Sequence, residues 1–182
     1  KYKKKKGTEK LSTWLSLLVL AFCFCIFGLV HYMDGRLPRP LTLADEQIHP
    51  DRFIEERARG HLRQLTSLGP RPAGSYENEV LAVDLIRRRL ESIQKKTKSA
   101  HLMSIDMQKP RGSFNLQFVD GLTQHYRDIT NIIVKLEPSL HGAKDALLVN
   151  CHFDSVPQSP GASDDAVSCA IMLEVLEILS QS

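Results

Sequence analysis

The chain has no internal repeat and no low-complexity tract except a run of lysines near its start. A repeat architecture is therefore excluded. It also lacks a basic excess in its main part. The first ten residues hold six Lys and one Glu out of 24 Lys and Arg and 21 Asp and Glu, which leaves 18 basic residues against 20 acidic ones. Since nucleic-acid binding requires basic residues clustered on a folded surface, we expect no nucleic-acid partner.

Charge is absent from Leu11 to Val30. Twenty helical residues span about 30 Å, the thickness of the hydrocarbon core of a bilayer. A cleaved signal peptide usually has a shorter apolar region and a small-x-small cleavage site, and a buried helix would not directly follow a lysine run. We therefore predict a transmembrane signal-anchor over residues 11–33, with the lipid bilayer as a partner.

The lysine-rich residues 1–10 are predicted to form a cytoplasmic tail, because positive charge stays on the cytoplasmic side of a membrane. Everything after about residue 33 would then be lumenal. No N-x-S/T sequon follows the apolar stretch, so glycosylation offers no independent check on this orientation.

Residues 34–50 have three prolines and no periodicity, and we interpret them as a linker to a body at 51–182. Apolar spacing in the body predicts helices and strands in mixed order, which is typical of an α/β fold. The predicted helices are Asp51–Leu68, a second beginning at Ser75, and Ala166–Leu179. The predicted strands are Met103–Met107, Phe114–Phe118, Ile129–Leu136 and Ala146–Cys151, the last of them apolar throughout and typical of a sheet interior.

Chemistry-bearing residues gather in Asn150–Asp165, which reads N-C-H-F-D-S-V-P-Q-S-P-G-A-S-D-D. His152 and Asp154 directly follow the predicted interior strand, at the edge where α/β sheets bind ligands. Alternate residues of an extended segment point to the same side, so Asp154 can accept the second ring N–H of His152. With Asp164 at the start of the next helix, these groups could hold a divalent metal. The alternatives are a chance H-x-D and a helix cap.

The four cysteines fall into two pairs. Cys23 and Cys25 lie in the apolar stretch and are interpreted as small apolar fillers. Cys151 and Cys169 flank the His/Asp segment. In an oxidising compartment they could form a disulfide. Buried free thiols, or Cys151 as a soft metal ligand, remain the alternatives.

Several blocks together resemble the co-catalytic zinc aminopeptidase family, which includes secreted bacterial leucyl aminopeptidases, glutamate carboxypeptidase and, as a relative, glutaminyl cyclase. The blocks are G-P-R-P-A-G-S-Y-E-N-E (69–79), R-G-S-F (111–114), I-T-N-I-I-V-K-L-E-P (129–138) and H-F-D-S-V-P-Q-S-P-G-A-S-D-D (152–165). The resemblance implies a three-layer α/β/α domain with a mixed sheet. It also implies peptide hydrolysis by two Zn2+ ions, with a peptide or protein substrate. Together with the predicted membrane anchor, these blocks resemble members of the family that lie in the endoplasmic reticulum membrane.

The resemblance also implies roles for individual residues. His152 would be a terminal ligand of one zinc, Asp154 the residue that orients this histidine, and Asp164 the carboxylate that bridges both metals. The peptide between Asp164 and Asp165 falls where the family has a cis bond. Cys151 and Cys169 fall where glutaminyl cyclase has a disulfide.

The family's catalytic Glu and its remaining ligands follow this first block, and the sequence ends at Ser182. We therefore expect the N-terminal part of a membrane-anchored zinc aminopeptidase, with an incomplete α/β domain, no general base, and no activity of its own. The alternatives are a glutaminyl-cyclase-like transferase with one zinc and a non-catalytic lumenal binding module with the same fold. The first is favoured by the Cys151 and Cys169 pair.

Overall fold

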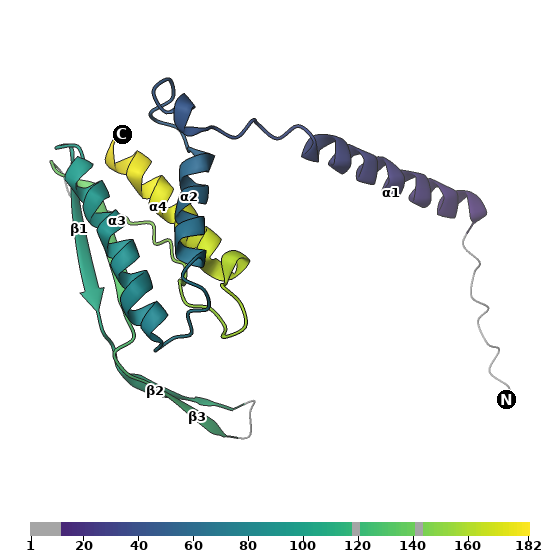
Figure 1. The fold of residues 1–182 in the computed structure, drawn as a ribbon. Helices are drawn as coiled ribbons and strands as arrows, with labels where there is room; N and C mark the ends of the chain where they lie inside the picture. The colour runs from purple at the N-terminus through teal and green to yellow at the C-terminus, as the bar shows by residue number, and fades with distance from the viewer. Residues whose placement is uncertain (1–11, 118–120, 141–143) are drawn as a thin grey trace. The chain divides into compact units, whose positions relative to one another are not determined.

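A computed structural model describes residues 12–117, 121–140 and 144–182, so the predicted lysine tail and Phe118 lie outside the described residues. The chain divides into two compact units, Lys1–Arg39 and Pro40–Ser182. The first holds helix α1, Thr13–Asp34 (Figure 1). By length and composition α1 could cross a membrane. None of its residues is buried, as expected of a helix whose apolar side chains face lipid.

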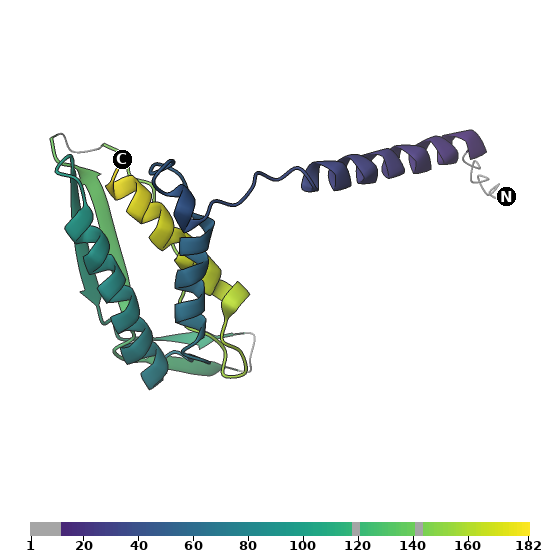
Figure 2. The same ribbon diagram turned by 45° about the horizontal axis from the view of Figure 1, so that its top comes forward.

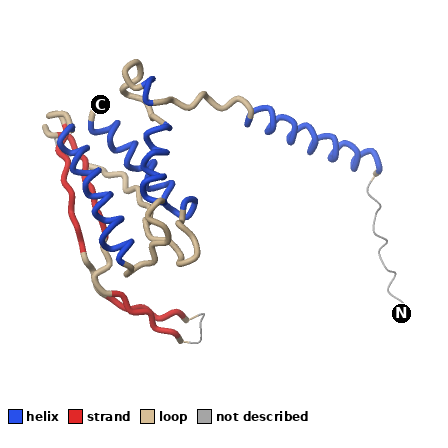
Figure 3. The backbone as a smooth tube through the Cα atoms, in the orientation of Figure 1, coloured by secondary structure: helices blue, strands red, loops and turns tan. Residues whose placement is uncertain are grey.

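The second unit contains the other helices and all the described strands (Figure 3). After a 3-10 turn at Leu43–Asp45, the helical segments are α2 (Glu55–Thr66), η2 (Glu77–Ala82), α3 (Val83–Lys96), η3 (Ala162–Ala166) and α4 (Val167–Ser180). The strands are β1 (His101–Gln108), β2 (Gly112–Leu116), β3 (Leu122–Tyr126) and β4 (Asn131–Pro138). Ser75 acts as predicted at a helix start, because its hydroxyl oxygen accepts the N–H of Asn78 at 3.1 Å.

The described strands form two antiparallel pairs, β1 with β4 and β2 with β3. In the first pair Met103 lies opposite Leu136 and Ile105 opposite Val134. These alternate residues are half-buried, whereas Leu102 before them and Ser104 between Met103 and Ile105 are exposed, so one face of the pair is covered. Figures 1 and 2 show α3 along the β1–β4 pair and the β2–β3 hairpin extending beyond it.

The hydrophobic core lies where the three helices of the second unit meet each other and the β1–β4 pair. Its buried members come from α2, η2, α3, η3 and α4, and they are Leu65, Ala82, Ile86, Leu90, Ala166 and Cys169. At about 25 cal/mol per Å2 of apolar surface, this burial is the main term that holds the helices on the sheet. The result is an incomplete α/β domain, as the sequence predicted.

Two features of the sheet differ from the prediction. Ala146–Cys151 is not a paired strand, and Leu147 and Leu148 are 90% and 87% exposed. An extended segment becomes a strand only by hydrogen bonding to a neighbour, and this segment pairs with none of the described strands. For the same reason the described strands show antiparallel pairs and no mixed sheet. The second difference is strand β3, which the sequence did not predict.

Candidate metal site

The predicted site segment is anchored at its start by a disulfide and at its end by a helical segment. Cys151 and Cys169 form a disulfide that joins the segment to α4. The segment then runs without regular structure through His152 and Asp154 and enters η3, which carries Asp164. The peptide between Asp164 and Asp165 is cis.

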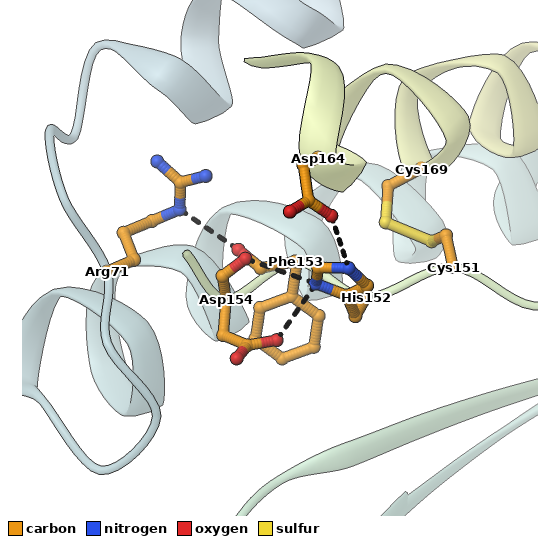
Figure 4. Close-up of a disulfide and its surroundings, with 7 residues drawn as sticks. All are labelled: Arg71, Cys151, His152, Phe153, Asp154, Asp164 and Cys169. Carbon is orange, nitrogen blue, oxygen red and sulfur yellow. Dashed lines mark hydrogen bonds and ion pairs between the residues drawn. A yellow bond between two sulfur atoms is a disulfide. The ribbon is translucent and has the colours of Figure 1, made fainter. Parts of the chain in front are cut away.

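The structure brings His152, Asp154 and Asp164 together, although Asp164 lies twelve residues after the histidine (Figure 4). The Nε2 atom of His152 is 3.1 Å from Oδ1 of Asp164. The other ring nitrogen, Nδ1, is 3.2 Å from Oδ1 of Asp154 and 3.3 Å from its backbone oxygen. The imidazole is therefore held between two carboxylates, one at each nitrogen.

These carboxylates shift the titration of the imidazole. Partial burial works against the positive charge, but the charge of Asp154 and the hydrogen bonds to Asp154 and Asp164 outweigh it. The pKa of His152 is consequently raised above its usual value. A protonated ring donates an N–H to each carboxylate, so a cation at Nε2 would take the place of one of these protons.

The donor set fits a divalent metal such as zinc. Zinc binds histidine nitrogen and carboxylate oxygen at about 2.0–2.2 Å, so two ligands of one tetrahedral ion are separated by about 3.3 Å. The observed 3.1 Å between Nε2 of His152 and Oδ1 of Asp164 is close to that spacing. The Asp164 side chain is 83% exposed, which leaves room for further ligands on its outer side.

A second group of potential metal ligands lies inside the helical layer. Among the described residues, the only three His, Cys, Asp or Glu side chains with ligand atoms within 4.8 Å of one another are His61, Glu174 and Glu177. The two glutamates are buried, at 0% and 2% exposure. The sequence analysis did not single out this group.

Positively charged side chains of the protein already pair with the two glutamates of this second group. Arg57 donates to Glu174 through Nε at 2.7 Å and Nη2 at 2.9 Å. Glu177 is paired with Arg89 and with Lys96. The hydrogen bond with Glu174 raises the pKa of Arg57, so the guanidinium stays charged. A divalent ion would face arginines and lysine at close range, and we interpret the group as an ion-pair network that connects α2, α3 and α4.

Sequence reasoning gave Arg71 no role of its own and used it only as part of the 69–79 block that resembles the family. The structure buries Arg71 completely, beside Phe153 and Asp154 of the site segment (Figure 4). Its Nε donates to the backbone oxygen of Phe153, the residue between His152 and Asp154. The available signal was its place in that block, ahead of the site segment.

The fold and the site define a class of protein. Residues 131–182, which include the whole site segment and α4, match Peptidase family M28. This stretch is therefore similar to part of an M28 peptidase domain.

Comparison with curated proteins shows which peptidases the chain is similar to. The chain is 52% identical over 142 residues to "Endoplasmic reticulum metallopeptidase 1" of Homo sapiens, covering 78% of this chain and 16% of that protein. It is 44% identical over 182 residues to "Putative endoplasmic reticulum metallopeptidase 1-A" of Caenorhabditis elegans, covering 98% and 20%. It is also similar, at 28%, to a "Vacuolar membrane protease" of Laccaria bicolor, covering 91% and 15%. The chain thus spans a fifth or less of the length of these relatives. No solved structure matches it.

Proposed function

We propose that this chain supplies the first half of the metal site of a zinc-dependent peptidase anchored in the endoplasmic reticulum membrane. The observation that carries the proposal is the arrangement around His152, with Asp164 at Nε2 and Asp154 at Nδ1. The similarity to endoplasmic reticulum metallopeptidases supports the reaction class and the compartment.

Each residue has a distinct task. Asp154 accepts the Nδ1 proton, which fixes the tautomer of His152 and leaves Nε2 as the metal ligand. Asp164 contributes an exposed carboxylate that can bind one ion or bridge two. Zinc bound between them would supply a Lewis acid for the peptide carbonyl and lower the pKa of a water molecule.

We further propose that the 182 residues alone hydrolyse no peptide. A general base must lie within hydrogen-bond reach of the water that it deprotonates. In the described part of the chain, no third protein ligand reaches the His152 and Asp164 pair with the spacing of a complete site. The remaining groups are expected from sequence that follows the site segment in the family.

The proposal is tested with the full-length gene product, measured for bound zinc and for release of an N-terminal residue from peptides. His152→Ala and Asp164→Asn should remove both zinc and hydrolysis. His61→Gln, in the second ligand group, should keep the zinc. A parent protein without zinc, or a His152→Ala variant with normal zinc and hydrolysis, would overturn the proposal. The second result would favour a non-catalytic module.

A glutaminyl-cyclase-like transferase is the second candidate, and the disulfide between Cys151 and Cys169 favours it. Assays of the same protein with peptides that begin with glutamine separate the two. Pyroglutamate formation without hydrolysis would establish the transferase. Hydrolysis alone would exclude it.

The orientation in the membrane is also a proposal, with residues 1–10 cytoplasmic, α1 spanning the bilayer and the second unit lumenal. The lysine run and the disulfide support it, because disulfides persist in the lumen and not in the cytosol. Protease treatment of sealed microsomes tests it. The segment after residue 33 should be protected, and digestion without detergent would refute the orientation.

A further inference from the structure

Arg71 is a fully buried cation whose side-chain hydrogen bonds all go to backbone oxygens. Its exposure is 0%. Within α2 and just after it, Nη1 donates to the oxygens of Leu65 at 3.0 Å and Gly69 at 2.7 Å. On the other side, Nε donates to Phe153 at 3.1 Å and Nη2 to Pro160 at 2.9 Å.

The four acceptors define what Arg71 connects. Leu65 lies in the last turn of α2 and is buried in the core, and Gly69 lies three residues after the helix. Phe153 lies between His152 and Asp154 in the sequence. Pro160 directly precedes the turn that leads to Asp164. A single guanidinium therefore ties both limbs of the site loop, residues 152–164, to one rigid helix end.

The backbone of Arg71 adds a second connection through Ser155. The N–H of Arg71 donates to the Ser155 hydroxyl oxygen at 2.8 Å, and the N–H of Ser155 donates to the oxygen of Arg71 at 2.9 Å. The Ser155 hydroxyl in turn donates to the oxygen of Ser159 at 2.7 Å. Gly161 packs tightly against Ser155, because a Cβ at position 161 would lie only 2.7 Å from Cβ of Ser155.

Stability alone does not account for this arrangement. Burial lowers the pKa of Arg71, and the charge of Asp154 only partly offsets that effect. No carboxylate pairs with Arg71 among the described residues, and a buried charge without an opposite partner costs several kcal/mol before its hydrogen bonds are counted. What the hydrogen bonds achieve is a fixed path for the loop that carries His152 and Asp164.

We propose that Arg71 is a positioning residue that holds His152 and Asp164 at metal-binding separation by fixing both limbs of the site loop. The proposal rests on the proposed function of the loop as a metal site. Lysine cannot replace arginine here, since an ammonium group donates from one atom and cannot serve carbonyls on both sides of a planar fork.

The test uses the full-length gene product with four sequences: the parent, Arg71→Lys, Ser155→Ala and Leu90→Ala. Leu90 is a buried core residue of α3 outside the loop, so Leu90→Ala is the control for a loss of stability alone. Zinc affinity is measured by chelator competition on folded protein. Amide hydrogen exchange of residues 152–165 is measured without metal, and a core peptide from α3 serves as reference.

Groups that orient metal ligands typically contribute about 10- to 100-fold to metal affinity. Arg71→Lys and Ser155→Ala should therefore weaken zinc binding about tenfold or more and speed exchange in the loop with little change in α3. Leu90→Ala should leave zinc affinity within about twofold.

Unchanged zinc affinity and unchanged loop exchange in Arg71→Lys would overturn the proposal, as would an equal loss of zinc affinity in Leu90→Ala. A parent protein that binds no zinc would overturn the proposed function. In that case faster loop exchange in Arg71→Lys would still establish that Arg71 fixes the loop, and unchanged exchange would refute it.

Discussion

The disulfide between Cys151 and Cys169 gives the most direct estimate of stability. It closes a ring over a sequence separation of 18 residues, and the ring contains every predicted metal ligand. Opening a ring of this length releases chain entropy in the unfolded state, which amounts to about 3 kcal/mol at 25 °C. Cys151→Ser with Cys169→Ser should therefore destabilise the second unit by about 3 kcal/mol.

Urea unfolding followed by brief proteolysis measures this difference. With a urea dependence of about 1–3 kcal/mol per M, the midpoint should fall by about 1–3 M. The matched control is Cys23→Ser with Cys25→Ser, which removes two exposed free thiols from α1 and no bond. This control should leave the midpoint unchanged.

An equal midpoint in the Cys151/Cys169 variant and the parent, both under non-reducing conditions, would refute the reasoning. Mass spectrometry of the unreduced parent should also show the two cysteine peptides linked. Reduction of the parent should reproduce the shift of the double variant, because the same ring is opened by a different route.

Three further substitutions test local interactions by the same urea assay or by hydrogen exchange. Burial opposes ionisation of Glu79, but hydrogen bonds from Gly74, Thr130 and Asn78 hold its pKa below the usual range. Glu79→Gln should therefore cost about 1–2 kcal/mol at neutral pH. That deficit should shrink as the pH falls below about 4.3 and the parent loses its own charge, and a pH-independent deficit would contradict this. Glu174→Gln removes the buried charge that accepts two hydrogen bonds from Arg57, which keeps its ion pairs with Glu46 and Glu177. It should cost about 1.5–3 kcal/mol, whereas a change below about 1 kcal/mol would contradict the ion-pair network. Gly161→Ala should loosen the site loop in hydrogen exchange more than Gly69→Ala, since both have positive φ but only Gly161 lacks room for a Cβ. Equal effects would show that close contact at Gly161 is unimportant.

Periodicity was sufficient to predict most of the regular structure. α2 and α3 follow apolar spacing of three and four residues, and β1 follows alternation, so their faces were readable from the sequence. Only the first strand of the β2–β3 hairpin was predicted, because the hairpin packs on no other helix or strand with more than marginal contact and four of the five residues of β3 are exposed. Without a buried face a strand leaves little hydrophobic pattern.

The candidate site was readable for a local reason. Residues at i and i+2 of an extended segment share a side, so the sequence alone places Asp154 beside His152. The approach of Asp164 to His152 depends on the path of the loop between Asp154 and Asp164. That path is set by the buried guanidinium of Arg71 and its bonds to backbone oxygens, and such bonds require no particular residue type in the loop. Only the resemblance to a family indicated it.

Helix α4 shows where hydrophobic reasoning fails for a physical reason. The sequence predicts the helix from its apolar residues, yet Ile171, Val175 and Leu179 are 44%, 39% and 50% exposed. Glu174 and Glu177 are buried in their place. A charge can be buried when a partner is buried with it, and the partners lie on α2 and α3, far away in sequence. The same ion pairs bring α4 against the first turn of α2. Helix α4 also carries Cys169, whose disulfide to Cys151 holds the start of the loop that contains the predicted metal ligands.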